Sequence, residues 1–242
     1  MPHLADAVFG VLVVVAYPLW DYFVSWPRAK ARLLAGEPNA RWRLYRAAIL
    51  TQWIAVAFVA GLWIAFGRPA ADLFLRLPAG PWLIGSIGLV IGVVTVFVAQ
   101  VAGVARANAE RRAALRPRLG YATLILPHDT TEHRWFVPLA LTAGFCEEVV
   151  YRGFLIWLFA SSIGLWAAAA VSVAIFGVSH AYMGRTGAVR ATVAGAIFAA
   201  LAVALRSLIP GMVLHAVIDL AAGSMGYLIL GETSTVADVP SL

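Results

Sequence analysis

The chain has 242 residues, of which 62% are hydrophobic and 12% are charged, and its mean hydropathy is +0.86. This apolar content exceeds what a water-soluble domain of this size buries in its core, and it excludes a soluble globular protein. The net charge of +6 does not indicate a nucleic-acid partner, because the arginines are spread over the links between apolar segments. The composition therefore indicates an integral membrane protein.

Several apolar stretches approach the roughly 20 residues that cross a roughly 30 Å hydrocarbon layer. In chain order they cover approximately residues 7–26, 47–66, 82–103, 135–160, 164–183, 188–205 and 209–230. The predicted fold class is therefore all-α, a polytopic transmembrane helix bundle of about seven spans. The first stretch is expected to stay as a helix, since no Lys or Arg precedes Arg28 and no small-residue cleavage site follows.

The charges of the links predict the orientation. Residues 27–46 hold six basic side chains against the single acid Glu37, which predicts a cytoplasmic link. Strongly and weakly basic links alternate, so we expect the N-terminus outside and the C-terminus in the cytoplasm. The short Ala/Arg-rich chain without sorting signals favours a bacterial inner membrane. No internal repeat is found, and we expect one integrated domain, with residues 1–134 forming spans one to three and a basic cytoplasmic loop, and residues 135–242 forming a catalytic helical core.

Ionisable side chains inside a span cost about 3 kcal/mol or more at the bilayer centre, so each is a candidate functional group. Here they gather in spans four, five and seven. The residues of this pattern are Glu147, Glu148 and Arg152, then Phe176 and His180, then His215 and Asp219. Asp21, deep in span one, belongs to no motif, and we place it outside the site.

Helical geometry separates the two adjacent glutamates. Glu148 and Arg152, four residues apart, share one face of a helix and can form an ion pair. Glu147 points about 100° away and stays free. A carboxylate beside a water-accessible cavity suits a general base that takes a proton from water, which is the role we assign to Glu147. The structural alternative for Glu148 and Arg152 is a buried ion pair that only fixes helix packing, and Phe176 is expected to be a packing residue.

His215 and Asp219 also share a helix face, and His180 can address the same point from span five. Three helices are thus expected to converge on one polar pocket. The predicted boundaries conflict with this, because straight helices would place His180 and His215 at depths that differ by about 15 Å. Convergence therefore requires span five or span seven to break, tilt or end elsewhere.

The patterns E-E-x-x-x-R, F-x-x-x-H and H-x-x-x-D, in this order, resemble the CAAX protease and bacteriocin-processing (CPBP/Abi) family of intramembrane proteases, whose eukaryotic relatives trim prenylated CAAX proteins. The resemblance covers about residues 144–226. It implies peptide-bond hydrolysis in the membrane, with Glu147 and His180 activating a water and His215 with Asp219 stabilising the oxyanion. The family's third motif often ends in Asn. An ionised Asp219 cannot donate a hydrogen bond, so it must be protonated, orient His215 or bind a metal.

The same resemblance implies a second version of the site, in which zinc is bound by His180, His215 and a carboxylate, Glu147 or Asp219. The expected partners are a peptide or protein substrate in the membrane and the lipid bilayer, with no nucleic acid.

Other functions remain open at this point. They are a proton-coupled transporter, a non-catalytic membrane adaptor or immunity protein of the same fold, and a serine-type peptidase. The serine-type reading lacks a G-x-S-x-G context around Ser224.

Overall fold

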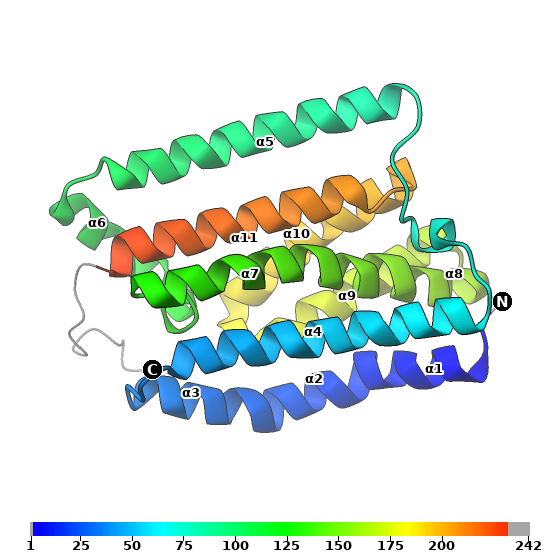
Figure 1. Cartoon of the computed structure of the whole chain (residues 1–242), viewed down its shortest axis with the longest axis horizontal. Coiled ribbons are helices and arrows are strands. Elements are labelled where there is room, and N and C mark those ends of the chain that lie inside the picture. Colours follow the sequence, from blue (N-terminus) through cyan, green and yellow to red (C-terminus); the bar gives the residue numbers. More distant parts are fainter. Residues whose placement is uncertain (1, 232–242) are drawn as a thin grey trace.

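The computed structural model describes residues 2–231, which form helices running side by side with no strand among them (Figure 1). The predicted all-α fold class is confirmed. Within the described residues, five helices are long and apolar enough to cross a membrane. They are Leu4–Leu34, α4 (Ala40–Ala65), α5 (Pro81–Ala105), Ala181–Leu205 and α11 (Ile209–Leu230). The protein is therefore an all-α membrane bundle.

The predicted count of about seven spans is not confirmed. The fourth predicted span is a continuous helix formed by α7 (Thr130–Glu147), the π-helical segment η6 (Glu148–Leu155) and α8 (Ile156–Ile163). This helix has ample length but carries three charged side chains near its middle. The fifth is α9 (Leu165–Ser179), whose 15 residues extend only about 22 Å, short of a roughly 30 Å hydrocarbon layer.

The short α9 removes the conflict over depth. After α9 the chain makes one 3₁₀ turn, η7 (Ala181–Met183), and enters α10 (Gly184–Leu205). The fifth predicted span, 164–183, therefore ends too late, and the sixth, 188–205, begins too late. Gly184 makes the reversal at a φ of 74°, which glycine adopts without strain. His180 consequently lies beside Glu147, midway along the helix of residues 130–163, where α11 also reaches.

The first predicted span is part of a longer helix that forms side-chain hydrogen bonds to other segments near both of its ends. It consists of α1 (Leu4–Val11), η1 (Leu12–Ala16), α2 (Tyr17–Trp20), η2 (Asp21–Ser25) and α3 (Trp26–Leu34), with η1 and η2 π-helical. Near its start, the buried carboxylate of Asp6 accepts hydrogen bonds from both terminal nitrogens of Arg68 at 2.8 and 2.6 Å. Near its end, Lys30 Nζ donates to the Tyr121 hydroxyl at 3.0 Å.

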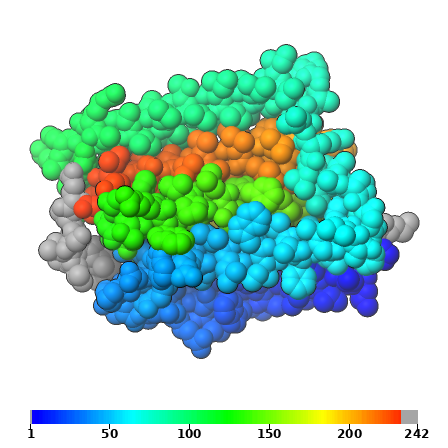
Figure 2. Space-filling model, viewed as in Figure 1, coloured from blue at the N-terminus to red at the C-terminus, as the bar shows by residue number. Residues whose placement is uncertain are grey.

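α5 lies on the side of the molecule opposite the first helix and packs along α11 (Figures 1 and 2). Ser86 is its only buried residue, so most of α5 faces the surroundings of the bundle. Short helical turns complete the connections: η3 (Ala70–Leu73), α6 (Ala109–Leu115), η4 (Arg116–Arg118) and η5 (Gly120–Leu124). The arginine-rich segments 28–46 and 106–134 lie at the end of the bundle away from the N-terminus (Figure 1).

Gly144 allows α7 and α11 to pack closely next to the predicted site. A Cβ atom at this position would lie 2.7 Å from the Ala216 nitrogen and 2.9 Å from the Met212 oxygen. Both are backbone atoms of α11, so only a shift of the whole helix could relieve the clash. Small residues at helix interfaces commonly permit such approach in membrane proteins.

We therefore predict that Gly144→Ala lowers the free energy of unfolding by about 1–3 kcal/mol, the usual cost of overpacking. Unfolding of the detergent-solubilised protein measures the effect. Gly88→Ala on α5 is the matched control, because an added Cβ there meets nothing within 4 Å. Equal stability of the two variants would show that α7 and α11 are not in tight contact at Gly144.

Candidate active site

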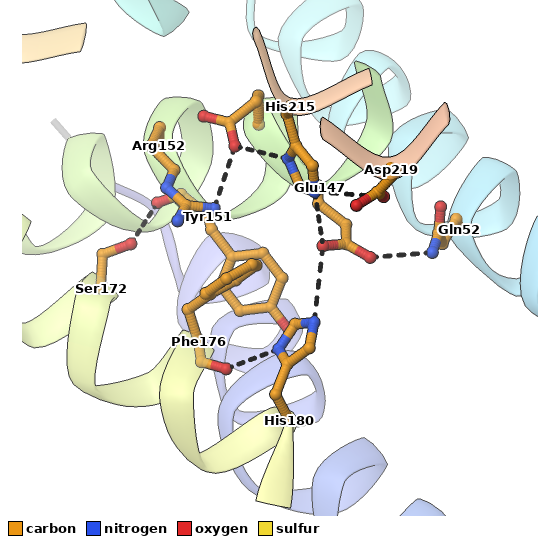
Figure 3. Close-up of polar contacts among 10 residues, drawn as sticks. Gln52, Glu147, Tyr151, Arg152, Ser172, Phe176, His180, His215 and Asp219 are labelled. Carbon is orange, nitrogen blue, oxygen red and sulfur yellow. Dashed lines mark hydrogen bonds and ion pairs between the residues drawn. The ribbon is translucent and has the colours of Figure 1, made fainter. Parts of the chain in front are cut away.

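The structure brings the four predicted site residues together from three helices (Figure 3). Glu147 ends α7, His180 follows the last residue of α9, and His215 and Asp219 lie one turn apart on α11. Glu147 Oε2 lies 3.9 Å from His180 Nε2 and 3.8 Å from His215 Nε2. Asp219 Oδ2 lies 3.6 Å from His215 Nε2. One carboxylate oxygen thus faces both imidazoles.

Each imidazole is oriented by a hydrogen bond at its other nitrogen. His180 Nδ1 lies 2.8 Å from the Phe176 carbonyl oxygen, and His215 Nδ1 lies 3.0 Å from Glu148 Oε1. A carbonyl oxygen only accepts hydrogen bonds, so His180 carries its proton on Nδ1 and, when neutral, offers a lone pair at Nε2. The carboxylate of Glu148 likewise accepts from His215 Nδ1. Both Nε2 atoms are therefore directed toward Glu147.

The predicted pair of Glu148 and Arg152 is present and fully buried. Arg152 Nη1 lies 3.2 Å from Glu148 Oε1, and neither side chain is exposed to solvent. The guanidinium stands 4.0 Å above the ring of Phe176, which in turn lies 4.3 Å from the His180 ring. Phe176 thus packs against this pair as expected, and its backbone oxygen also orients His180. A buried charge needs such a partner, so Arg152 compensates Glu148 while Glu148 holds His215.

The donor set has the composition of a zinc site, but its spacing does not match one. Two ligands of tetrahedral zinc, each about 2.0–2.1 Å from the metal, lie about 3.3–3.4 Å apart. The distances from Glu147 Oε2 to the two Nε2 atoms are longer, at 3.8 and 3.9 Å. Among residues 2–231, no three His, Cys, Asp or Glu side chains stand close enough to hold one metal ion. We therefore derive no chemical step through a metal.

Two polar residues near this site belong to none of the three motifs. Gln52 on α4 donates a hydrogen bond from Nε2 to Glu147 Oε1 at 3.0 Å. Asp21, which the sequence placed outside the site, lines the same cavity as Glu147 and His180. The only sequence signal for either residue is a polar side chain within an apolar span. Neither residue belongs to a recognisable motif, so the sequence did not connect them with the site.

A large cavity connects these residues with the basic end of the bundle. Its volume is about 1580 Å³, more than the roughly 300–1,000 Å³ of common small-molecule pockets. The four site residues line it together with Tyr17 and Asp21 of the first helix. Toward the other end it is lined by Arg118, Arg185 and Arg190, which are exposed. The cavity is large enough to admit a peptide segment.

Apolar helices of membrane length that enclose carboxylate and imidazole groups are typical of an integral membrane protein, and they make this cavity a candidate functional site. The family model described as type II CAAX prenyl endopeptidase Rce1-like matches residues 130–221, which contain every motif residue named above. This match confirms the resemblance seen in the motifs. At the level of the family, it supports the interpretation that the protein is a hydrolase, a CAAX-type intramembrane protease. No curated protein and no solved structure matches the chain.

Proposed function

We propose that the protein is a glutamate-type intramembrane endopeptidase that hydrolyses a peptide bond of a membrane-associated protein, or of a leader or C-terminal peptide. The observation that carries this proposal is the orientation of Glu147 Oε2 toward the Nε2 atoms of His180 and His215. These separations exceed a direct hydrogen bond and suit a water molecule about 2.8 Å from each atom.

In the first step, the water donates its two hydrogens to Glu147 Oε2 and His180 Nε2, which leaves an oxygen lone pair for attack. That oxygen bonds to the carbonyl carbon of the substrate while Glu147 takes one proton. The carbonyl carbon becomes tetrahedral, and its oxygen becomes an oxyanion. Glu147 then passes its proton to the leaving nitrogen, the carbon–nitrogen bond breaks, and a carboxyl group and an amine are released.

His215 and Asp219 are placed to stabilise the oxyanion. His215 donates from Nδ1 to Glu148, so it donates from Nε2 as well only as an imidazolium. The carboxylate of Glu148, 3.0 Å from Nδ1, balances that charge. Asp219, whose Oδ2 lies 3.6 Å from Nε2, adds a second donor to the oxyanion in its protonated form. A donor aimed at the developing oxyanion is a large contribution to catalysis of acyl transfer.

The distribution of arginines supports an orientation for the protein in a bacterial inner membrane. Arginine-rich segments face the cytoplasm in membrane proteins, which favours a cytoplasmic position for residues 28–46 and 106–134. The N-terminus then lies outside, and the part of the cavity that Arg118 lines lies toward the cytoplasm. The C-terminus, expected in the cytoplasm, lies among residues 232–242, outside the described residues.

A reconstituted cleavage assay tests the function. Protein in liposomes is incubated with a farnesylated peptide ending in Cys-a-a-X and with the same peptide lacking the lipid, and mass spectrometry identifies new termini. Zinc is measured in the same preparation and in His180→Ala and His215→Ala. Cleavage without zinc supports the glutamate mechanism, and stoichiometric zinc lost in both variants would establish a metal-centred hydrolase instead. No zinc and no cleavage of any membrane peptide would favour the adaptor function.

The role of Asp219 gives a separate prediction. If Asp219 donates a hydrogen bond in its protonated form, Asn can replace it, and Asp219→Asn should keep activity within about 10-fold of the natural protein. Asp219→Leu has no donor and should lose about 100- to 1,000-fold in kcat, as when an oxyanion donor is removed. Equal losses in the two variants would show that the charge of Asp219, rather than a donated hydrogen bond, is needed.

A further inference from the structure

The carboxylate of Glu147 has a hydrogen-bond partner outside the segment that matches the family model. Gln52 lies on α4, which packs along α7, and its Nε2 donates to Glu147 Oε1 at 3.0 Å (Figure 3). An ionised carboxylate only accepts hydrogen bonds, so the amino group of the amide must face it. The first part of the chain thus contributes a side chain to the site.

This hydrogen bond decides which oxygen of Glu147 meets the imidazoles. The terminal torsion of a glutamate is broad and nearly two-fold, so an unrestrained carboxylate turns easily. Gln52 holds Oε1, and Oε2 is left facing His180 and His215, buried and without a hydrogen bond of its own. The hydrogen bond from Gln52 on α4 therefore fixes the orientation of the Glu147 carboxylate plane.

Packing between the helices does not require the amide. The neighbouring Trp53 already ties α4 to α7, since its Nε1 donates to Thr142 Oγ1 at 3.3 Å and its ring stacks 5.5 Å from Phe145. Gln52 Oε1 is buried without a hydrogen-bond partner within the described residues. A buried amide that is only half satisfied costs free energy, which an apolar residue at a purely structural position would avoid.

We propose that Gln52 is a positioning residue, which orients Glu147 so that Oε2 addresses the water between the two imidazoles. Its consequence for catalysis rests on the proposed peptidase function. The orientation of the carboxylate is a property of the resting protein and can be measured without turnover.

The kinetic test is Gln52→Leu, which removes the donor but keeps an apolar side chain on α4. We expect kcat to fall about 10- to 100-fold, as for loss of a residue that orients a catalytic ligand, with KM unchanged. Trp53→Phe, which removes the hydrogen bond to Thr142 and keeps an aromatic ring beside Phe145, should keep kcat within about 3-fold. If Gln52→Leu does not fold, Gln52→Met replaces it, because its side chain has a similar length and carries no N–H or O–H donor. An unchanged kcat, or a loss confined to KM, would overturn the proposal.

A double variant shows whether Gln52 acts through Glu147. In Glu147→Asp the carboxylate is withdrawn by one methylene and no longer reaches Gln52. Adding Gln52→Leu to that variant should therefore cost less than about 3-fold in kcat, since coupled residues are not additive. A loss as large as in the natural background would contradict the proposal.

A chemical readout separates this proposal from the peptidase function. Dicyclohexylcarbodiimide modifies protonated carboxyl groups in membranes, and the adduct on Glu147 is quantified by mass spectrometry. In Gln52→Leu the amide no longer covers Oε1 and the carboxylate is free to turn, so Glu147 should be labelled several-fold faster in this variant than in the natural protein or Trp53→Phe. Equal labelling rates would refute the contact even in an active peptidase. Faster labelling in a protein that cleaves nothing would leave the contact standing and refute the peptidase.

Discussion

Replacing Glu147 with glutamine should lower kcat for peptide cleavage by about 100- to 10,000-fold, the range that a positioned general base contributes. Glutamine has nearly the same shape and can still contact Gln52, but its amide cannot take a proton from water. The variant should therefore fold and bind substrate like the natural protein. Initial rates in liposomes, combined with a thermal unfolding curve in detergent, measure the two properties separately.

Glu110→Gln provides the matched control for this prediction. Glu110 is an exposed residue of α6 and does not line the cavity, so the same chemical change should leave kcat unaltered. Retained cleavage in Glu147→Gln would remove Glu147 from its role as the base. A loss of folding in that variant, by contrast, would show that its carboxylate is needed for structure.

The motifs predicted which side chains come together at the candidate site better than they predicted where the helices around it end. Four-residue spacing puts two side chains on one helix face whatever the helix packs against, so the pairs Glu148–Arg152 and His215–Asp219 followed from the sequence. The end of α9 did not, because the apolar run continues through Ala181 and Met183 without a proline or a charge to stop it. Membrane helices that end inside a bundle depend on their neighbours, which one sequence does not reveal.

Contacts between distant helices were also beyond sequence reasoning. Gln52 is a single neutral polar residue in an apolar span, and which helix it meets depends on how α4 docks on α7. The π-helical form of residues 148–155 was not predicted either, because no sequence pattern distinguishes it from an α-helix here. Such segments occur frequently at functional sites, and this one begins at the residue after Glu147. The proposed roles of the site residues and the division at residue 134 remain predictions.

Removing the guanidinium of Arg152 should be among the most destabilising changes in the protein. Arg152→Ala removes the guanidinium that lies 3.2 Å from the fully buried carboxylate of Glu148, and breaking a buried pair in this way costs about 3–5 kcal/mol. Unfolding of the detergent-solubilised protein measures the loss. Arg43→Ala is the control, because Arg43 and its partner Glu37 are both nearly half exposed, and an exposed pair contributes about 0–1 kcal/mol.

A double variant separates the structural and catalytic consequences of this pair. Replacing Glu148 and Arg152 together by methionine removes both charges, and apolar replacements of a buried pair are often neutral or stabilising. We therefore expect stability to return to within about 1 kcal/mol of the natural protein. Cleavage should stay impaired, because His215 has then lost the acceptor at Nδ1 that orients it. Recovery of both properties would show that the pair serves packing alone and that His215 is oriented by other contacts.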